Sequence, residues 1–501
     1  MRELEVIMNP NKLVQHLKKP ANEFTRYDII KFIDDMKIEM LNFRYIGEDG
    51  KLKTLNFVIT GKNYLESILS TGERVDGSSL FSFIEAGSSD LYVIPRFSTA
   101  YVNPFTEKPT LDILCSFYTK EGRPLESAPE YILKKASRLF FEETGLSFKA
   151  MGELEYYVIS KKDELYPDVD QRGYHSSLPF TNHERLRTEA MQLIAQCGGK
   201  IKYGHSEVGN FTEGDLQYEQ HEIEFMPVEP ENAVEQLIIA KWILRMLGSK
   251  YGVLISFAPK ITVGKAGSGL HIHFQVDRDD VNIMADHKGL TDTAKKVIAG
   301  ILGKAQSLTA FGNTVPTSYL RLVPHQEAPT MVCWGAGNRS ALVRVPLGWI
   351  AKTNMIKDAN PQELGIVPYI EGKQTVEFRV PDGSADLYHL LAGLVLAAKA
   401  GLLDKDSLAK AERLCVNVNI FKEENKHILE RLVALPASCS SSADYLEKER
   451  AFYEMNTVFP KGTIDNFLKK LRSYRDNNLS EELFGKKEKI RELVDKYMHC
   501  M

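Results

Sequence analysis

The sequence predicts an α+β fold in which a small N-terminal domain is followed by a large domain of antiparallel sheet flanked by helices. At 501 residues with 43% hydrophobic side chains, the chain can bury enough apolar surface for two domains. Strand-like alternation and helical periodicity follow one another irregularly, which argues against a doubly wound parallel sheet. Gly122 and Pro124 interrupt the pattern between the two parts. We therefore expect an N-terminal arm at 1–25, a first domain at 26–122 and a second domain at 123–501.

The first domain combines a helix with several strands. Residues 27–36, YDIIKFIDDM, carry apolar side chains at helical spacing. Residues 38–59 alternate on either side of a Glu-Asp-Gly turn, a pattern typical of a β-hairpin. Residues 91–97 and 111–118 alternate in the same way and predict two further strands.

The second domain is expected to open with a helix at 127–145, because Ser127 and Glu130 have the spacing of a capping box and Gly145 can end the helix. After it, helical patterns and strand-like runs are mixed. We expect strands at 149–160, 221–228, 269–276, 340–346 and 375–382, and helices at 230–252, 291–311, 384–402 and over the charged C-terminal part.

Composition excludes several classes of protein. Charged residues make up 26% of the chain and the net charge is −4, so no electrostatic feature suggests nucleic acid as a partner. No apolar run approaches the roughly 20 residues that span a bilayer, and the N-terminus lacks the apolar block of a signal peptide. The cysteines lack Cys-x-x-Cys spacing and are expected to be free thiols in a reducing cytoplasm. They are Cys115, Cys197, Cys333, Cys415, Cys439 and Cys500.

The stretch GKAGSGLHIHF, residues 264–274, places two histidines one residue apart inside an apolar run. Side chains alternate between the two faces of a strand, so His271 and His273 should point the same way. The same argument puts Glu153 and Glu155 of GELEYY on one face, and Glu377 and Arg379 of VEFRV on another. Each pair, taken alone, fits an exposed strand face or an ordinary salt bridge as well as a functional site.

Glu207 and Glu222 lie in two further strand-like runs. If these five glutamates and a histidine converge, the oxygen-rich set with an imidazole suits Mg²⁺ or Mn²⁺ better than structural zinc. The chain has no P-loop, no His-Glu-x-x-His and no Gly-x-Ser-x-Gly, so nucleotide handling would depend on metals and arginines. Guanidinium groups match carboxylate and phosphate oxygens, although any one arginine fits a surface ion pair. The candidates are Arg321, Arg339 and Arg344.

The blocks VDGSS, GELEYY, HSEV, EQHEIEF, GSGLHIH, RLVPHQEAP, NRSALVRVP and VEFRVPDGSADLY occur in the order found in the glutamine synthetase family. The chain resembles that family from about residue 41 to 403, and most closely its bacterial type I members. The resemblance implies a β-grasp-like N-terminal domain and an active site at the junction with the neighbouring subunit. It also implies a homo-oligomer, a dodecamer of two stacked hexameric rings.

The resemblance further implies a site for two or three Mg²⁺ or Mn²⁺ ions with ATP as co-substrate. By motif, Glu155, Glu207 and Glu222 would hold one ion, and Glu153, His271 and Glu377 a second. The residues implied on the nucleotide side are His273, Gln275, Arg339 and Arg344.

The implied reaction joins ammonia to the γ-carboxylate of glutamate through γ-glutamyl phosphate, giving glutamine, ADP and phosphate. In it, Asp76 would bind ammonium and take its proton, and Glu327 would close a flap over the intermediate. The metals, with Arg339 and Arg344, would neutralise charge on the transferring phosphoryl group, and Arg379 would contact the phosphate as well as the glutamate. The residues implied in substrate binding are Ser79, Tyr174, Ala266, Gly267, Arg321, Glu327 and Arg379.

Departures from the family pattern leave other activities open. Ala266 stands where the family has Asn, and His325-Gln326 where it has Gly-Tyr. Both changes alter the glutamate and acceptor pockets and would suit a ligase that uses an amine such as putrescine. Retention of Asp76, Tyr174 and Glu327 favours ammonium, because a small cation needs a carboxylate cage. A non-catalytic family member is a third alternative, but it would have lost metal ligands that are retained here.

Overall fold

The computed structural model of the chain describes residues 6–84, 89–163, 165–167, 169–324, 328–348, 354–363, 365, 373–420 and 422–500. The flap residues His325, Gln326 and Glu327 lie outside this part of the chain, so the role expected for Glu327 has no structural counterpart here.

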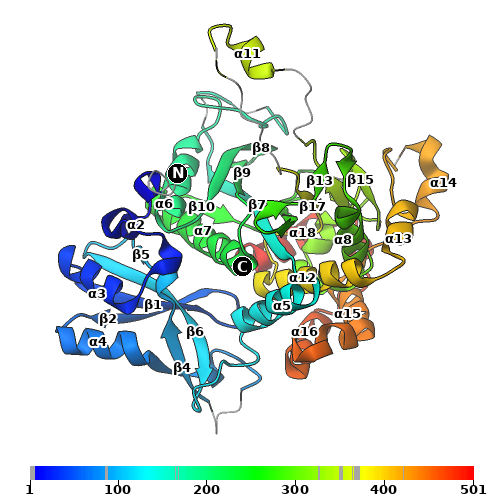
Figure 1. Ribbon diagram of the computed structural model, residues 1–501. Helices are drawn as coiled ribbons and strands as arrows, with labels where there is room; N and C mark the ends of the chain where they lie inside the picture. The colour runs from blue at the N-terminus through cyan, green and yellow to red at the C-terminus, as the bar shows by residue number, and fades with distance from the viewer. Residues whose placement is uncertain are drawn as a thin grey trace.

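The N-terminal domain is built on a six-stranded sheet in the order β2-β1-β6-β4-β3, with β5 beside β6 (Figure 1). Strands β1 and β6 are parallel and the other pairs are antiparallel. The helices pack their apolar faces on this sheet, and Leu13 and Val14 of the segment expected to be an arm are buried in the same core. The elements are α2 (Lys12–Leu17), α3 (Arg26–Asp35), β1 (Met40–Ile46), β2 (Leu52–Val58), α4 (Lys62–Thr71), β3 (Glu73–Asp76), β4 (Asp90–Pro95), β5 (Tyr101–Val102) and β6 (Thr110–Thr119).

The second domain contains a nine-stranded sheet with the main order β15-β16-β17-β11-β7-β9-β8. Every pair is antiparallel except β15–β16, so the expected antiparallel sheet is confirmed with one parallel edge pair. Its strands are β7 (Ser147–Lys161), β8 (Ile201–Glu213), β9 (Leu216–Phe225), β10 (Leu254–Ser256), β11 (Leu270–Arg278), β12 (Val281–Asn282), β15 (Trp334–Ala336), β16 (Val343–Val345) and β17 (Val376–Phe378). A separate hairpin joins β13 (Ala285–Asp286) and β14 (Gly289–Leu290).

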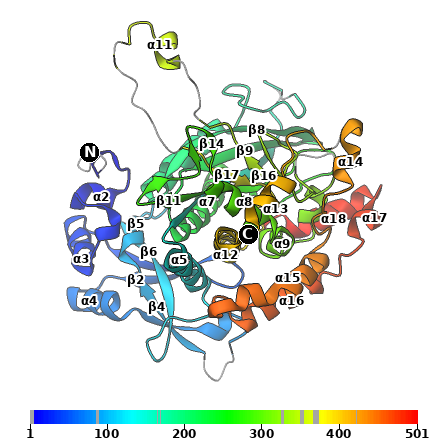
Figure 2. The same cartoon turned by 45° about the vertical axis from the view of Figure 1, so that its right-hand side comes forward.

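Long helices cover one face of this sheet, and α7 and α12 run beneath it while α11 stands apart (Figures 1 and 2). On β7, Gly152 leaves the space that Leu237 of α7 fills: a Cβ at Gly152 would lie 2.8 Å from the leucine. Leu154 and Tyr156 belong to the same buried cluster. The opposite parity of β7, which carries Glu153 and Glu155, therefore faces away from α7. The helices are α5 (Pro129–Thr144), α6 (Glu184–Gln196), α7 (Pro230–Tyr251), α8 (Asp292–Leu302), α9 (Ala305–Gly312), α10 (Ser318–Arg321), α11 (Met355–Ala359), α12 (Leu387–Leu403), α13 (Ser407–Arg413), α14 (Lys426–Leu429), α15 (Cys439–Glu454), α16 (Lys461–Ser473), α17 (Leu479–Leu483) and α18 (Lys487–Tyr497).

The two domains contact each other through α7. The guanidinium of Arg44 on β1 lies 4.7 Å from the ring centroid of Trp242, and Phe105 meets the same ring edge-on at 5.3 Å. Arg96 forms a salt bridge with Glu235, which lies about two turns before Trp242 on α7. Aromatic burial and a cation over an indole face both favour a fixed contact between the domains.

Most of the predicted elements are confirmed, with two corrections. The capping box expected at Ser127 and Glu130 is wrong: the N-cap of α5 is Ala128, and the Glu130 carboxylate instead accepts the N–H of Phe117 on β6 at 3.0 Å. Pro129 at the first helical position has no N–H, so one of the unpaired donors of the helix start is absent. The helix expected at 291–311 is divided into α8 and α9 by a break at residues 303–304.

Among the described residues, no single helix has the length and apolar composition of a membrane span. The bent pair α12 and α13 meets those two criteria only when both helices are taken together.

Candidate active site

The face of β7 that points away from α7 meets the corresponding face of β11 directly. Glu153 lies opposite His271 in the strand register, and its carboxylate contacts both histidines. His271 Nδ1 is 2.9 Å from Glu153 Oε2, and His273 Nε2 is 2.7 Å from Glu153 Oε1. Glu155 Oε1 lies 3.9 Å from the other nitrogen of His271. The predicted common face of the two histidines, and that of the two glutamates, is confirmed.

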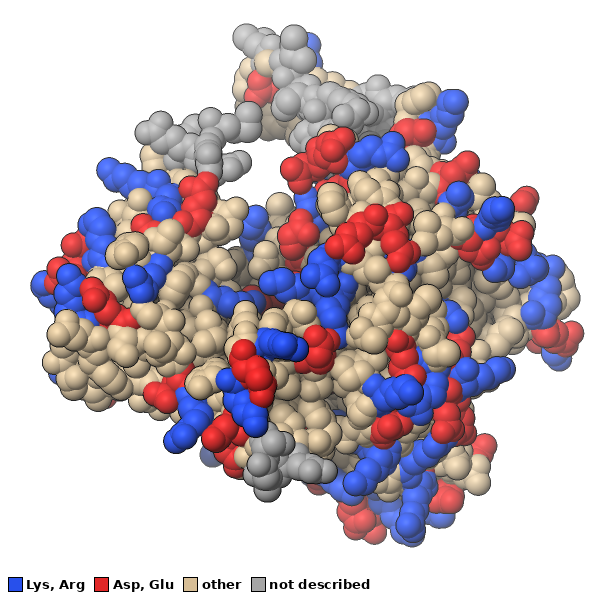
Figure 3. Space-filling view, turned by 60° about the horizontal axis from the view of Figure 1, so that its bottom comes forward, with Lys and Arg blue, Asp and Glu red and all other residues tan. Residues whose placement is uncertain are grey.

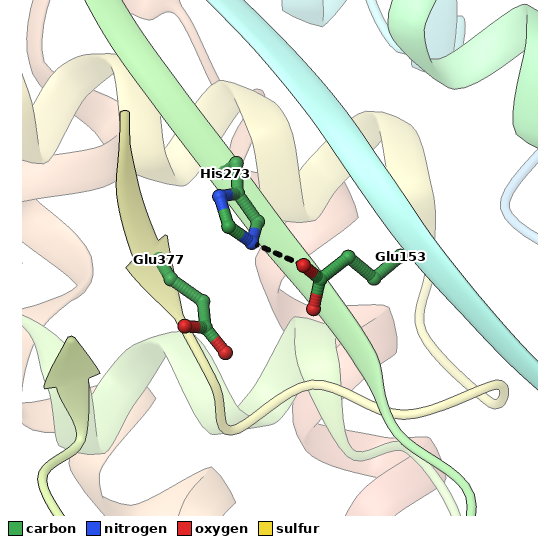
Figure 4. Close-up of side chains that lie close together, drawn as sticks. All are labelled: Glu153, His273 and Glu377. Atoms are coloured by element: carbon green, nitrogen blue, oxygen red, sulfur yellow. Dashed lines mark ion pairs between the residues drawn. The ribbon is translucent and has the colours of Figure 1, made fainter. Parts of the chain in front are cut away.

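Strand β17 brings a third carboxylate to this group (Figure 4). Glu377 lies opposite His273 in the register, and its Oε1 is 3.3 Å from His271 Nδ1. Arg379 Nε donates to Oε1 and Arg344 donates to Oε2, both at 2.9 Å. The predicted shared face of Glu377 and Arg379 is confirmed, and Arg344 from β16 completes the contacts.

These contacts change the pKa values of the buried groups. Burial acts to raise the pKa of Glu153, but the charges and hydrogen bonds of the two histidines outweigh it and hold that pKa well below its usual range. Burial acts to lower the pKa of His271, but its contacts with Glu153 and Glu377 raise it to about 9. Burial and the Glu153 charge act to raise the pKa of Glu377, and the two histidines lower it to about 2. Without a metal, the site is therefore a network of paired charges.

Glu155, Glu207 and Glu222 form the second half of the acidic face. Glu155 lies opposite Glu222 in the β7–β9 register, and its Oε2 accepts the N–H of Gly269 at 2.7 Å and the amide of Gln220 at 3.0 Å. Burial and the charge of Glu155 raise the pKa of Glu207 to about 7. Burial and the neighbouring carboxylates raise the pKa of Glu222 well above its usual range. Here burial and the repulsion between carboxylates outweigh the nearby basic groups.

Sequence reasoning missed two members of this face, His205 and Glu224. One ligand atom from each, together with one from Glu222, lies within 4.8 Å of the others. His205 Nε2 is 3.4 Å from Glu222 Oε1, and Glu224 bonds Lys202 at 2.6 Å. The alternation of side chains along a strand could have identified both residues. His205 stands two residues before Glu207, and Glu224 two residues after Glu222, so each shares a face with a glutamate already chosen.

The donor set fits hard divalent cations. The clustered groups are carboxylates with imidazoles and no thiolate, which suits Mg²⁺ or Mn²⁺. The raised pKa values of Glu207 and Glu222 record a local excess of negative charge that a cation would relieve. One atom each from Glu153, His273 and Glu377 also lie within 4.8 Å of one another, so His273 belongs to the same group of possible ligands.

Arg321 lies beside this face and is held by the main chain. It donates to the carbonyl of Val380 at 2.8 Å, and its Nη2 is 3.5 Å from His271 Nε2. Two glycines make room for it, because a Cβ at Gly267 would lie 3.1 Å from its Cγ and a Cβ at Gly269 only 2.6 Å from its Nη2. The side chain of Arg321 thus occupies the space that these two glycines leave.

Three more of the expected residues, Ala266, Gln275 and Arg339, form hydrogen bonds within the chain. Ala266 is fixed at both main-chain groups, since its N–H donates to Gln171 at 2.8 Å and its carbonyl accepts the Tyr157 hydroxyl at 2.8 Å. Gln275 donates to Asp277 at 2.7 Å, two residues along β11. The carbonyl of Arg339 accepts a hydrogen bond from Arg379.

Tyr174 lies beside β8, whereas Asp76 and Ser79 lie in the other domain. The N–H of His175 donates to the Ser206 carbonyl at 2.9 Å, and the ring of Tyr174 meets that of His205 edge-on with centroids 5.4 Å apart. Asp76 accepts the Ser79 hydroxyl at 2.7 Å, and hydrogen bonds from neighbouring serines lower its pKa. Within the described residues, neither Asp76 nor Ser79 has a hydrogen bond or ion pair to the acidic face.

Both domains match models of one protein family. Residues 126–480 match the glutamine synthetase catalytic domain, and residues 37–120 match the glutamine synthetase β-grasp domain. The chain belongs to the glutamine synthetase family. The β-grasp domain followed by a large catalytic domain is the fold expected from the sequence.

Named relatives and solved structures of the glutamine synthetase family resemble the chain over most of its length. Glutamine synthetase of Thermotoga maritima is 28% identical over 431 residues, which is 84% of this chain and 90% of the relative. That of Methanococcus maripaludis is 27% identical, covering 88% and 93%. The cryo-EM structure of Plasmodium falciparum glutamine synthetase aligns with a TM-score of 0.74 at 20% identity, covering 91% of this chain and 97% of that one. A structure titled GmaS/ADP complex aligns with a TM-score of 0.70 at 17% identity, covering 90% and 96%.

Proposed function

We propose that this member of the glutamine synthetase family ligates ammonia to the γ-carboxylate of L-glutamate, with ATP as co-substrate and γ-glutamyl phosphate as intermediate. One observation carries the proposal: carboxylates and imidazoles from five strands converge on one face of a sheet with three arginines beside them. Phosphoryl transfer needs this combination, because its catalysis rests on positioning and on charge neutralisation.

The proposed metal sites follow the two halves of the acidic face. Glu155, Glu207 and Glu222 would hold one ion, and Glu153, His271 and Glu377 a second. Such ions, when bound, neutralise phosphate oxygens and orient the transferring group. The proposed nucleotide-side residues are His273, Gln275, Arg339 and Arg344.

Arg321 and Arg379 would clamp the glutamate, because guanidinium forks pair well with carboxylates. Arg321 lies next to His271 and Arg379 next to Glu377, so a substrate held there reaches the acidic face. Main-chain contacts with Ala266 and Gly267 would fix the amino-acid end.

The acceptor side of the proposal requires a second subunit. Asp76 would bind ammonium and accept its proton, with Ser79 and Tyr174 beside it. Asp76 and Ser79 would come from a neighbouring copy, in the type I arrangement of two stacked hexameric rings in the cytoplasm. Glu327 would cover the intermediate and exclude water.

The direct test is ADP release from ATP and glutamate in the presence of Mg²⁺ or Mn²⁺, comparing ammonium with methylamine and putrescine. We expect ammonium to give the highest kcat/KM. A protein that releases ADP with glutamate and putrescine but not with ammonium would refute the acceptor assignment. Glu155→Ala should weaken Mn²⁺ binding, and unchanged affinity would refute the ligand assignment.

The second candidate is a γ-glutamyl-amine ligase, and one observation favours it. The rings of Tyr174 and His175 stack with centroids 4.1 Å apart. The rings of His175 and His205 are tilted relative to each other, with centroids 4.4 Å apart. Stacked aromatic faces beside Glu222 would suit an organic ammonium ion better than ammonium itself. Tyr174→Ala would distinguish the two: a loss confined to alkylamines supports this candidate, and equal loss with ammonium opposes it.

A further inference from the structure

The side chain of Gln220 connects three parts of the acidic face. Lys, Arg, Asp and Glu side chains are spread over the surface shown in Figure 3, whereas Gln220 on β9 is 2% exposed and lies in the interior. Its Nε2 donates to Glu155 Oε2 on β7 at 3.0 Å and to the carbonyl of Gly267 at 2.9 Å. Its Oε1 accepts the N–H of Gly209 on β8 at 3.0 Å. One buried amide therefore joins β9 to two neighbouring strands and to the loop before β11.

A bulge in β8 explains the contact with Gly209. The β8–β9 register shifts between Ser206 and Asn210, so the three residues of β8 between them stand opposite Gln220 alone. A regular ladder cannot pair every main-chain group of such a segment. The amide oxygen of Gln220 takes the place of a main-chain acceptor for the Gly209 N–H, and a Cβ at Gly209 would lie only 2.4 Å from that oxygen. Glu207 stands in the same bulge, so Gln220 also holds the segment that carries this carboxylate.

The chemistry of the neighbours fixes which end of the amide faces Glu155. An ionised carboxylate and a main-chain carbonyl only accept hydrogen bonds, so the nitrogen of Gln220 must face Glu155 and Gly267. Glu155 Oε2 also accepts the N–H of Gly269 at 2.7 Å. Two N–H groups thus hold one oxygen of the carboxylate. The other oxygen, Oε1, lies 3.9 Å from His271 Nε2 and so faces the rest of the acidic site.

The same amide holds the loop that is expected to bind the amino-acid end of the substrate. The Gly267 carbonyl accepts from Gln220, and the next N–H, that of Ser268, donates to the carbonyl of Pro259 at 3.0 Å. Because one Nε2 bonds both Gly267 and Glu155, a displacement of the loop would be passed to the carboxylate, and the reverse.

We propose that Gln220 is a positioning residue, which orients Glu155 for a divalent cation and keeps the Gly267 loop aligned with it. Gln220 acts through these two neighbours. The inference rests on the proposed function, which assigns Glu155 to an ion and Gly267 to glutamate. Removing a group that holds a metal ligand in this way typically costs about 10–100-fold in metal affinity or activity.

Direct Mn²⁺ titration of the full chain, without ATP or glutamate, tests the effect on Glu155. Gln220→Met keeps the length of the side chain and removes both donors, so we expect the Mn²⁺ Kd to rise about tenfold or more. Gln217→Met is the matched control. Gln217 is also 2% exposed on β9 and donates to a carboxylate, Glu219 Oε1, at 3.0 Å, but its opposite parity places it on the other face of the sheet. Both variants should lower the melting temperature, and Gln217→Met should leave the Mn²⁺ Kd unchanged.

Glutamate kinetics test the effect on the loop. At saturating Mn²⁺ and ATP, we expect Gln220→Met to raise the glutamate KM about tenfold, with a smaller change in kcat. A general loss of folded protein would instead lower kcat and leave KM as it is. Gln217→Met should retain the KM of the parent protein.

Gln220→Leu is measured beside Gln220→Met, so one folded variant is enough to decide. An unchanged Mn²⁺ Kd or an unchanged glutamate KM in a folded variant would overturn the proposal, and so would an equal rise of the Mn²⁺ Kd in Gln217→Met. A parent protein that releases no ADP would refute the proposed ligase activity alone, because the Mn²⁺ comparison needs no turnover.

Discussion

Glu377 is the residue on which the charges of the candidate site depend most directly, and Glu377→Gln tests that arrangement. The substitution keeps the shape of the side chain but removes its charge. His271, Arg344 and Arg379 would then surround a neutral amide. Because Glu377 is almost wholly buried, water cannot replace the lost charge.

Two estimates of the cost agree. The pKa of Glu377 falls from an ordinary value of 4.5 to about 2, which corresponds to roughly 3 kcal/mol of stability. Removing one partner of a buried ion pair typically costs about 3–5 kcal/mol. Because the folded-state pKa is lowered, this stability is present above pH 4.5 and is lost as the pH falls toward 2.

Urea unfolding of the metal-free protein in EDTA measures this cost. At pH 7 we expect Glu377→Gln to lose about 3 kcal/mol, and the difference from the parent protein should shrink as the pH is lowered from 5 toward 3. Glu213→Gln, an exposed position on β8, should change stability by less than about 0.5 kcal/mol. A Glu377→Gln protein as stable as its parent at pH 7 would refute the reasoning.

Three further results are expected. Gly401→Ala should lower the melting temperature at a cost of about 2 kcal/mol or more, because the new Cβ would lie 2.1 Å from the carbonyl oxygen of Lys296. Gly462→Ala should leave the melting temperature unchanged, because no atom lies within 4 Å of its new Cβ, and equal shifts in the two variants would contradict the packing of α8 on α12. The pKa of Lys241 is lowered from 10.5 to about 7, so the unfolded chain binds more protons between those values, and stability should rise with pH there in the parent but not in Lys241→Met. Saturating Mn²⁺ at 100 times its Kd should stabilise the parent by about 2.7 kcal/mol at constant pH, and Glu222→Gln should reduce that gain at the same concentration.

The faces of the strands could be predicted because side-chain direction in a strand depends only on residue parity. Parity alone is enough to place His271 with His273 and Glu153 with Glu155. It does not determine which strands are neighbours. The meeting of Glu153 with Glu377 depends on β11 lying between β7 and β17, and strand order of this kind is a long-range property.

The capping-box prediction failed for a related reason. Ser127 and Glu130 have suitable local spacing, but Glu130 is held by the Phe117 N–H of β6, so a contact between distant segments prevailed over the local one. The contacts of Gln220 were equally hidden, because a glutamine in a strand-like run fits an ordinary polar position. Only the bulge in β8 and the loop before β11 show which groups its amide binds.

The two halves of the acidic face differ in what balances their charge. Around Glu153 and Glu377 the chain supplies its own cations, two histidines and two arginines. Around Glu207 and Glu222, the ion-pair partner among the described residues is His205, whose Nε2 lies 3.4 Å from Glu222 Oε1. Burial together with neighbouring carboxylates raises the pKa values of both glutamates. This half therefore needs an external cation more than the other half does, because fewer basic side chains of the described residues pair with its carboxylates. A divalent ion at Glu207 and Glu222 would cancel a repulsion that the fold itself creates.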